Sequence, residues 1–337
     1  MLNIRKHNRE SDHSMYHIIV NPEASSGQGK KNREKLTPIL TAEHAAYELH
    51  EFASAKEMSD YVHTLTSKPD HAASSDSVTA ERSGRTHLIV LGGDGTLNLV
   101  LNAIADFDAV TLSCIRVGSG NDFARNVGVP KDAKKALLHL LHTPQESVLD
   151  YGEAVYVTED GRKGSRRFLI SSGIGYDAEI CVEANKSRAK KFLNAIRLGK
   201  LIYVAVGVKQ IFARHKTKAR IYMDDDTPIA VNDLFFVVQM IHRMEGGGVP
   251  FCPNADPRDG LLDICLAKRA SIPKLLLEVV MVYFKKHLLF SNITGHRCKS
   301  LRIELEDAPQ WIHTDGETPC RVKEAELSCK RGLHFVM

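Results

Sequence analysis

The sequence predicts a two-domain protein, with a doubly wound parallel α/β sheet in its first half and an antiparallel β domain in its second. The chain has 337 residues, more than one typical hydrophobic core holds. Up to about residue 145, strand patterns alternate with helical patterns, as in a parallel sheet. From about residue 146 the patterns are mostly β-type and separated by turns, which indicates an antiparallel sandwich or barrel.

The first half follows the order strand, helix, strand. Strands are expected at 16–20, 47–52, 87–91 and 114–117, and helices at 32–44, 56–66, 96–105 and 132–142. Two segments have few apolar residues. We expect residues 1–14 to form a disordered leader and residues 67–86 a mobile surface insert.

The second half contains β-type runs and two helical patterns. Strands are expected at 151–157, 166–174, 219–225, 233–240, 261–268 and 301–305, and helices at 186–214 and 273–289. Ser271 stands where the N-cap of the last helix is expected.

Composition narrows the class of protein. With 43% hydrophobic residues, 26% charged residues and a net charge of +4, the chain has the composition of an ordinary globular protein without a nucleic-acid-binding stripe. No apolar run reaches the length of a membrane span, and no secretory signal is visible. The seven cysteines are dispersed, as is typical of a reducing compartment. We therefore expect a cytoplasmic protein.

The segment LIVLGGDGTLN (88–98) ends a buried strand with Gly92, Gly93, Asp94, Gly95 and Thr96. Glycines let a ligand approach the bare backbone, and the N-terminus of the next helix attracts phosphate. A carboxylate beside a phosphate is repulsive unless a divalent cation lies between them. The motif therefore predicts either a phosphate site that uses a metal ion, or a tight turn in which Asp94 caps a helix.

Two more strand-to-helix loops have a similar composition. Residues 21–30, NPEASSGQGK, contain small residues, hydroxyl groups and a lysine, and residues 118–122, GSGND, again end in a carboxylate. In an open parallel sheet such loops gather at the carboxyl edge, where ligands bind. Three of them, two with aspartates, predict a nucleoside triphosphate site with a metal ion.

Together these motifs resemble the diacylglycerol kinase catalytic domain family, and most closely its soluble bacterial lipid kinases. The resemblance covers nearly the whole chain and rests on SGQGK (26–30), GGDGTLN (92–98), GSGNDFARN (118–126), GIGYDAEI (173–180), GGG (246–248), DPRDGLLD (256–263) and HTDGE (313–317). It implies a nucleotide-binding α/β domain at 1–145 and a β-sandwich lipid-substrate domain at 146–328. The tail at 329–337 would return to the first domain.

The resemblance also implies roles for individual residues. The residues near the nucleotide would be Asn21, Ser26, Gly27, Gly92, Gly93, Asp94, Gly95, Thr96 and Ser119. Asp94 and Asp122 would belong to a carboxylate–water–Mg²⁺ network, and Glu317 would be the general base. A second cation site would use the Asp259 side chain with backbone carbonyls near Asp256 and Leu261. At Glu317 and at Asp259, a plain Asp-Gly turn is the alternative.

Other features are open to two interpretations. Asp177 would cap a helix or join the carboxylate network. The basic residues between 186 and 216 would be solvated or rest on anionic lipid headgroups.

The chain departs from the family pattern at two places. Leu99 stands where the family commonly has a glutamate, and the insert at 67–86 is longer than the family usually carries.

The function that these features predict is an ATP-dependent lipid kinase that uses Mg²⁺ and converts diacylglycerol to phosphatidic acid. The alternatives are another lipid acceptor such as a sphingoid base or a polyprenol, a soluble acceptor such as NAD, or a non-catalytic nucleotide-binding protein. We expect a lipid substrate at the membrane surface, peripheral contact with the inner face of the membrane and no nucleic-acid partner; a homodimer is compatible with the sequence.

Overall fold

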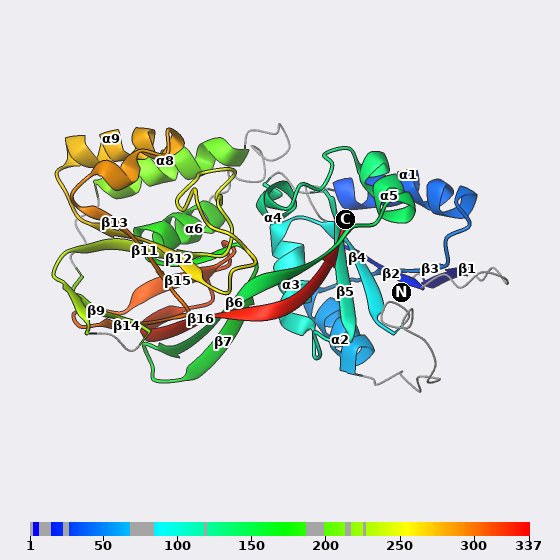
Figure 1. Cartoon of the computed structure of the whole chain (residues 1–337), viewed down its shortest axis with the longest axis horizontal. Coiled ribbons are helices and arrows are strands. Elements are labelled where there is room, and N and C mark those ends of the chain that lie inside the picture. The colour runs from blue at the N-terminus through cyan, green and yellow to red at the C-terminus, as the bar shows by residue number, and fades with distance from the viewer. Residues whose placement is uncertain are drawn as a thin grey trace. The chain divides into compact units, whose positions relative to one another are not determined.

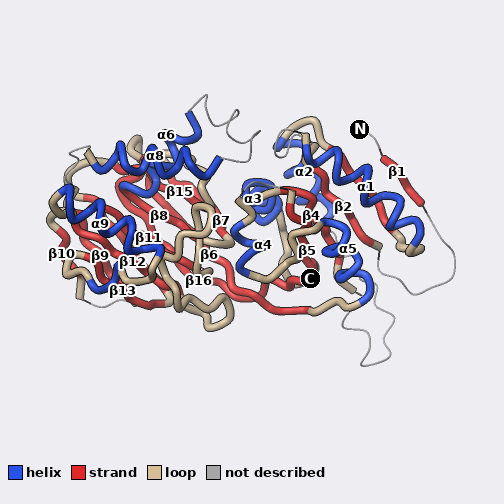
Figure 2. Tube along the Cα trace, turned by 90° about the horizontal axis from the view of Figure 1, so that it is seen from above, coloured by secondary structure: helices blue, strands red, loops and turns tan. Residues whose placement is uncertain are grey.

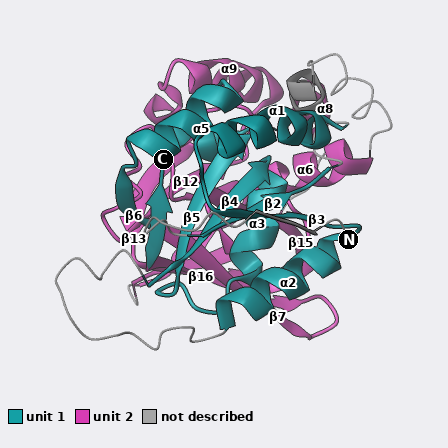
Figure 3. Ribbon diagram, turned by 90° about the vertical axis from the view of Figure 1, so that its right-hand side faces the viewer, with its two compact units in different colours: residues 1–149, 332–337 teal, residues 150–331 magenta. Residues whose placement is uncertain are grey.

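The computed structural model describes residues 3–6, 15–22, 27–67, 84–117, 120–186, 199–212, 217–224 and 227–337 (Figure 1). The chain divides into two compact units, which are residues 1–149 with 332–337, and residues 150–331 (Figure 3). The chain passes from one unit to the other within β6 (Glu146–Thr158) and again within β16 (Arg321–Val336). The sequence predicts a boundary near residue 145, and the first unit ends at residue 149. The sequence predicts a returning tail at 329–337, and the first unit includes residues 332–337.

Unit 1 is built on a sheet whose central strands are parallel, because apolar runs such as LIVL in β4 are buried on both faces. In spatial order, its strands are β1 (Asn3–Lys6), β3 (Tyr47–Glu51), β2 (Tyr16–Val20), β4 (Thr86–Gly92), β5 (Val110–Arg116) and the end of β16. In the last pair, β16 runs parallel to β5.

Helices cover both faces of this sheet (Figure 1). They are α1 (Gln28–Ala42) and α5 (Ala133–His142) on one face, and α2 (Ala55–Ser67) and α3 (Asp94–Ala103) on the other. Leu36 and Leu40 of α1 are buried against Ile18 and Leu49 of the sheet. Asp132 caps α5 by accepting the Lys135 backbone N–H at 2.8 Å, the N-cap role that aspartate commonly takes.

Unit 1 departs from the expected elements in three ways. Residues 3–6 of the expected disordered leader form β1, which pairs with the exposed edge of β3, since an unpaired edge accepts any extended backbone. Helix α1 begins at Gln28 and α3 at Asp94, earlier than expected. A short helix, α4 (Asp122–Asn126), was not expected. Most of the insert at 67–86 lies outside the described residues.

Unit 2 contains two β-sheets that pack face to face. The first has the order β15 (Gln310–Thr314), β8 (Ser171–Gly175), β11 (Leu234–Met240), β12 (Leu262–Lys268), β13 (Ile293–Cys298). The second has the order β10 (Ile229–Val231), β9 (Ala219–Met223), β14 (Ser300–Leu305), β16, β6, β7 (Lys163–Phe168). Ile174 and Ile264 from the first sheet share one buried core with Ile221 and Ile303 from the second. The expected fold class, a parallel α/β domain followed by an antiparallel β-sandwich, is confirmed.

Helices cover the outer side of the β8–β11–β12 sheet (Figures 1 and 2). They are α6 (Tyr176–Lys186), α8 (Gly199–Ile211), α9 (Ile272–Tyr283) and the 3₁₀ turn η1 (His287–Leu289). Of the helix expected at 186–214, the structure describes α8, while residues 187–198 lie outside the described residues; α6 was not expected. The helix expected at 273–289 ends at Tyr283, since Lys285 has a left-handed φ of 58° that breaks the helix. Ser271 is the N-cap residue of α9, as expected.

In the part of the chain that the structure describes, no helix is both long and apolar enough to cross a membrane.

Candidate functional site

The loops that follow β2, β4 and β5 meet at the carboxyl edge of the unit 1 sheet. Asn21, directly after β2, donates from Nδ2 to Thr96 Oγ1 at 3.2 Å. The Val117 N–H, directly after β5, donates to the Gly92 carbonyl at 3.1 Å. The structure therefore brings Asn21, Gly92 and Thr96 together, as the topological argument from the sequence predicts.

Two glycines at this edge stand where a side chain has no room. A Cβ on Gly92 would lie 2.5 Å from the Thr96 Cβ, and a Cβ on Gly29 would lie 2.0 Å from the Asn21 carbonyl oxygen. Helices α1 and α3 thus begin directly against the strands. Gly27 is the N-cap residue of α1 with a φ of 87°, while Gly93 is the N-cap residue of α3. Both helix N-termini therefore lie at this edge, where free N–H groups attract anions.

Asp94 links two of these loops. Its carboxylate accepts the backbone N–H of Asp122 at 3.0 Å and that of Phe123 at 3.1 Å. These are the first two residues of α4, so Asp94 caps a helix other than the one it begins. The two interpretations of Asp94 are therefore compatible, because a carboxylate that accepts two N–H bonds still has lone pairs for a metal ion.

Asp122 lies beside Asp94 and is almost fully buried, with 5% of its surface exposed. A Cβ on Gly120 would lie 3.0 Å from Asp94 Oδ2 and 3.9 Å from Asp122 Oδ2, so both carboxylates approach one point. The Arg125 guanidinium forms an ion pair with Asp122 and donates to the Gly120 carbonyl at 2.7 Å.

A second guanidinium, that of Arg116, lies nearby. Arg116 donates to the Ala124 carbonyl at 2.8 Å, and burial together with the Arg125 charge lowers its pKa. Two carboxylates and two guanidinium groups therefore meet at a glycine-lined edge. This combination suits a phosphate group and a hard cation such as Mg²⁺. Ser26 and Ser119, which the sequence also assigns to this site, lie outside the described residues, while Gly95 lies in the first turn of α3.

In unit 2, the segment HTDGE forms a tight hairpin turn. Asp315 and Gly316 both have positive φ, at 51° and 83°, and Thr314 and Glu317 exchange backbone hydrogen bonds at 2.9 and 3.0 Å. This is the type I′ geometry that Asp-Gly favours. It leaves the Glu317 side chain exposed, as a carboxylate that receives a proton from a substrate requires.

The Asp315 side chain fixes this turn to a neighbouring segment. Its carboxylate accepts the backbone N–H groups of Leu169 and Ile170 at 2.8 Å each, and that of Ser171 at 3.1 Å. These three residues precede or begin β8, so the turn that carries Glu317 is fixed to a strand about 145 residues away in the sequence.

A buried charge cluster lies behind this turn, and the sequence did not reveal it. His313 Nε2 forms an ion pair with Asp177, and Glu245 accepts a hydrogen bond from the Ser171 hydroxyl. Burial opposes charge on the His313 ring, but the carboxylates of Asp177, Glu245 and Asp315 raise its pKa to about 9. Asp177 therefore serves as the partner of a charged histidine, a role that its position in GIGYDAEI did not indicate.

Gly173 makes room for this ion pair. A Cβ at Gly173 would lie 2.3 Å from Asp177 Oδ2 and 2.5 Å from His313 Nε2. The glycine of the GIGYD motif is therefore required by the contact between two side chains from separate elements.

The expected second cation site lies in the loop before β12. Asp259 accepts the Leu261 N–H at 3.0 Å and forms an ion pair with Arg297. The structure adds two carboxylates that sequence reasoning missed, Asp150 and Asp263. Asp150 accepts the Gly260 N–H at 2.7 Å.

The electrostatics of this loop favour a cation. Burial raises the pKa of both Asp150 and Asp263, and the charges of Asp259 and Asp256 raise each further. Among the described residues, the buried Asp263 Oδ2 atom has no hydrogen-bond partner. Hard oxygen donors grouped in this way fit Mg²⁺ or Ca²⁺.

Comparison with known proteins identifies both halves of the chain. Residues 15–154 match the diacylglycerol kinase catalytic domain, and residues 170–328 match the YegS C-terminal NAD kinase beta sandwich-like domain. The chain is 27% identical over 273 residues to a protein of Bacillus subtilis (strain 168) named "Putative lipid kinase YtlR", covering 77% of this chain and 84% of that one. It is 28% identical over 249 residues to a diacylglycerol kinase of Mycobacterium tuberculosis (strain CDC 1551 / Oshkosh), covering 74% and 75%.

A solved structure shares the fold. The crystal structure of a diacylglycerol kinase from Bacillus anthracis str. Sterne superposes with a TM-score of 0.66 and 24% identity, covering 96% of each chain.

The His313–Asp177 pair makes stability depend on pH. The folded pKa of about 9 exceeds the unfolded value of about 6.5, so this contribution is complete below about pH 6.5 and is lost as the pH rises through 9. We expect the wild-type Tm to fall between pH 6.5 and 9 by at least about 2 °C more than that of Asp177→Asn. Calorimetry at both pH values measures this. Asp233→Asn, at an exposed turn of the same unit, should behave like the wild type; equal pH dependence in all three proteins would contradict the assignment.

The carboxylate loop predicts stabilisation by a divalent cation. Adding millimolar Mg²⁺ or Ca²⁺ to chelator-treated protein should raise Tm by at least about 2 °C, because the ion binds the folded state alone. Asp259→Asn and Asp263→Asn should each remove most of this increase, whereas Glu306→Gln, an exposed carboxylate on the same unit, should keep it. An increase that both loop variants retain would place the cation elsewhere.

Proposed function

Since this chain belongs to the diacylglycerol kinase-like family of bacterial lipid kinases, we propose that it transfers the γ-phosphate of ATP to the hydroxyl group of diacylglycerol and forms phosphatidic acid. The observation that carries the proposal is the convergence of the Asp94 and Asp122 carboxylates at a glycine-lined sheet edge with two helix N-termini. Phosphoryl transfer is catalysed mainly by positioning and by charge neutralisation, and these are the groups that supply both.

Each group of residues would have a separate role in the reaction. Backbone N–H groups at the starts of α1 and α3 bind the phosphates, while Arg116 and Arg125 add positive charge. Asp94 and Asp122 would hold Mg²⁺, which when bound neutralises the phosphate oxygens. Glu317 takes the proton from the acceptor hydroxyl as the new P–O bond forms and the bond between the γ-phosphorus and the bridging oxygen of ATP breaks, which releases ADP. The departure from the family pattern at Leu99 does not touch Asp94, Asp122 or Glu317.

A lipid acceptor requires contact with a membrane, and the α9 surface provides a place for it. We define this surface by its exposed apolar residues, which are Leu277, Val280, Tyr283, Phe284, Leu288 and Leu289. Phe284, the C-cap residue of α9, is 66% exposed, and Leu289, in the 3₁₀ turn η1, is 80% exposed. An apolar patch of this kind on a folded protein marks a binding surface.

The charges around the α9 surface match an anionic membrane. Lys285 and Lys286 are exposed between Phe284 and His287, and Lys274 is partly exposed in the first turn of α9. The one acidic residue of α9, Glu278, is buried. Apolar side chains flanked by lysines are the pattern of a segment that lies in the interface of an anionic bilayer. We therefore propose α9 for the membrane contact; much of the basic segment 186–216 lies outside the described residues.

A labelling experiment tests the enzyme class. The protein is incubated with γ-labelled ATP, Mg²⁺ and a total bacterial lipid extract, beside Glu317→Gln and the control Glu159→Gln, an exposed carboxylate at another hairpin turn. The wild type and the control should produce labelled phosphatidic acid, and Glu317→Gln should be at least about 100-fold slower.

Each other outcome changes the proposal in a defined way. A labelled lipid of different mobility would replace diacylglycerol with a sphingoid base or a polyprenol. Labelled product from added NAD, without labelled lipid, would assign a soluble acceptor. ATP binding without any labelled product would identify a non-catalytic protein.

Vesicle sedimentation tests the α9 surface. Wild-type protein should sediment with phosphatidylglycerol-containing vesicles and much less with pure phosphatidylcholine. The double variant Phe284→Glu/Leu289→Glu should lose at least about tenfold in partitioning, because each charge opposes burial of its side chain in the interface. Val155→Glu places the same charge at another exposed apolar residue and should bind normally. Normal binding by the double variant would move the membrane contact elsewhere.

A further inference from the structure

A cluster of metal-ligating side chains lies in unit 1, outside the glycine loops. His17 is in β2, and Glu48 and His50 are in the neighbouring strand β3. The parallel register places His17 opposite Glu48 and Ile19 opposite His50. Because side chains alternate along a strand, all three polar residues face the same side of the sheet, the side covered by α2. No sequence motif connects them.

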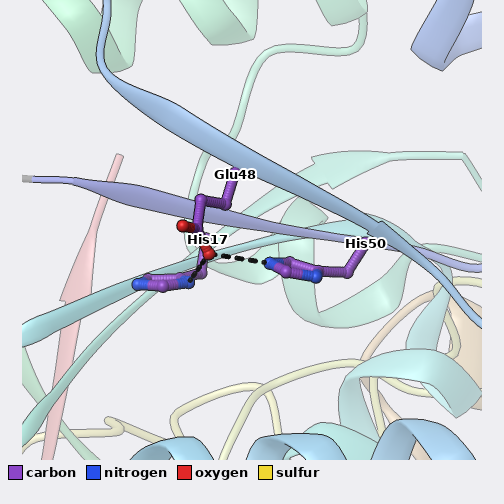
Figure 4. Close-up of side chains that lie close together, drawn as sticks. All are labelled: His17, Glu48 and His50. Atoms are coloured by element: carbon purple, nitrogen blue, oxygen red, sulfur yellow. Dashed lines mark ion pairs between the residues drawn. The ribbon is translucent and has the colours of Figure 1, made fainter. Parts of the chain in front are cut away.

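The donor atoms of this cluster converge (Figure 4). Glu48 Oε2 is 3.8 Å from His17 Nδ1 and 3.5 Å from His50 Nε2. From α2, the Tyr61 hydroxyl lies 2.7 Å from His50 Nε2 and 3.3 Å from His17 Nδ1. One nitrogen from each imidazole, one carboxylate oxygen and one phenol oxygen therefore surround a common point.

We propose that His17, Glu48 and His50 form a binding site for a divalent transition-metal ion of the zinc class, with Tyr61 or a water molecule as the fourth ligand. Metal–ligand bonds of about 2.0–2.1 Å in a tetrahedron place ligand atoms about 3.3–3.4 Å apart. The two Glu48 separations exceed this by a few tenths of an ångström, which small side-chain rotations supply. Ordinary N–H···O hydrogen bonds are shorter than both.

The donor set selects the kind of ion. Two imidazole nitrogens favour Zn²⁺, Co²⁺, Ni²⁺ or Cu²⁺, whereas Mg²⁺ and Ca²⁺ prefer oxygen donors alone. Two neutral imidazoles and one carboxylate carry a single negative charge, which a divalent ion turns into a single positive charge. The site is thus chemically distinct from the carboxylate sites that suit Mg²⁺.

Neighbouring aromatic side chains hold the three ligands in place, and the cluster is partly open to solvent. The exposed fractions of the three side chains are 15% for His17, 14% for Glu48 and 7% for His50, so an ion can reach the site without unfolding. The Tyr61 ring packs against the His50 ring with centroids 4.3 Å apart and against Phe52 at 5.3 Å. Such packing limits the orientations of the imidazole.

The buried Asp177–Glu245–His313 cluster of unit 2 differs from this one. There His313 Nε2 is already in an ion pair with Asp177, so binding a metal would require this pair to break. In unit 1, the ligand atoms of His17, Glu48 and His50 all lie within 4.8 Å of one another, and a bound ion would replace the hydrogen bond between the Tyr61 hydroxyl and His50 Nε2.

A bound ion would join β2, β3 and α2. It would therefore stabilise the folded unit by a free energy that grows with the logarithm of the ion concentration relative to the Kd of the site. This inference does not depend on the proposed kinase activity, because its readouts are binding and stability.

Cobalt binding tests the site directly. Untagged full-length protein is stripped with a chelator, dialysed and titrated with Co²⁺. We expect one equivalent per chain to give the intense visible bands of four-coordinate Co²⁺, and added Zn²⁺ to abolish them. Glu48→Gln and His50→Gln should each weaken Co²⁺ affinity at least about tenfold. His142→Gln removes a histidine from the exposed pair with Glu43, which belongs to no group of three metal-ligating side chains among the described residues, and should leave the affinity unchanged.

Several results would overturn the proposal. These are the absence of stoichiometric binding by the wild type, a purely octahedral Co²⁺ spectrum, or unchanged affinity in both variants. Circular dichroism of the metal-free proteins shows whether each variant is folded. If neither is, the wild-type spectrum and a Tm increase with one equivalent of Zn²⁺ but not with equal Mg²⁺ still decide the question.

Discussion

The carboxylate of Asp94 is the contact on which the candidate site of unit 1 depends. It belongs to the loop after β4, and it accepts the N–H groups of Asp122 and Phe123 in the loop after β5. Two hydrogen bonds to a charged acceptor fix the start of α4 and therefore the position of Asp122. The Arg125 guanidinium then closes the arrangement by contacting Asp122 and the Gly120 carbonyl. A carboxylate that looks like a ligand in the sequence is thus also the structural clamp between two loops.

In unit 2, an aspartate likewise accepts backbone N–H groups from a segment that is distant in the chain. Asp315 accepts three N–H groups at the start of β8, and this fixes the hairpin turn that presents Glu317. Behind the turn, the charged His313 is balanced by Asp177 and by two further carboxylates. A buried ion pair is a poor source of net stability, yet removing one partner leaves an uncompensated charge, so the pair tightly restrains the geometry around the turn. Both candidate loops are therefore set by aspartates whose partners are distant in the chain.

The loop before β12 differs from these two arrangements. Its carboxylates converge without enough positive charge to balance them. Asp150 and Asp263 have raised pKa values, although Arg331 and Arg297 lie beside them. Burial and mutual repulsion of the aspartates outweigh the guanidinium groups, and a divalent ion would correct this imbalance. At His17 and Glu48 the balance is different, because imidazole supplies neutral donors and the carboxylate alone carries charge.

The sequence by itself determined the fold class, the three glycine loops and the Asp-Gly turn before Glu317, because hydrophobic periodicity and turn chemistry are local properties of the chain. It placed Asn21, Gly92, Asp94, Thr96 and Asp122 at one sheet edge, while their roles with a nucleotide remain predictions. It missed the end of α9 at Tyr283, where a single left-handed residue outweighs an apolar pattern. Only the tertiary structure decided that Asp94 caps α4, that His313 is charged by Asp177, and that His17 meets His50. These pairs are set by strand register and by packing between distant segments, and no spacing in a single sequence encodes either.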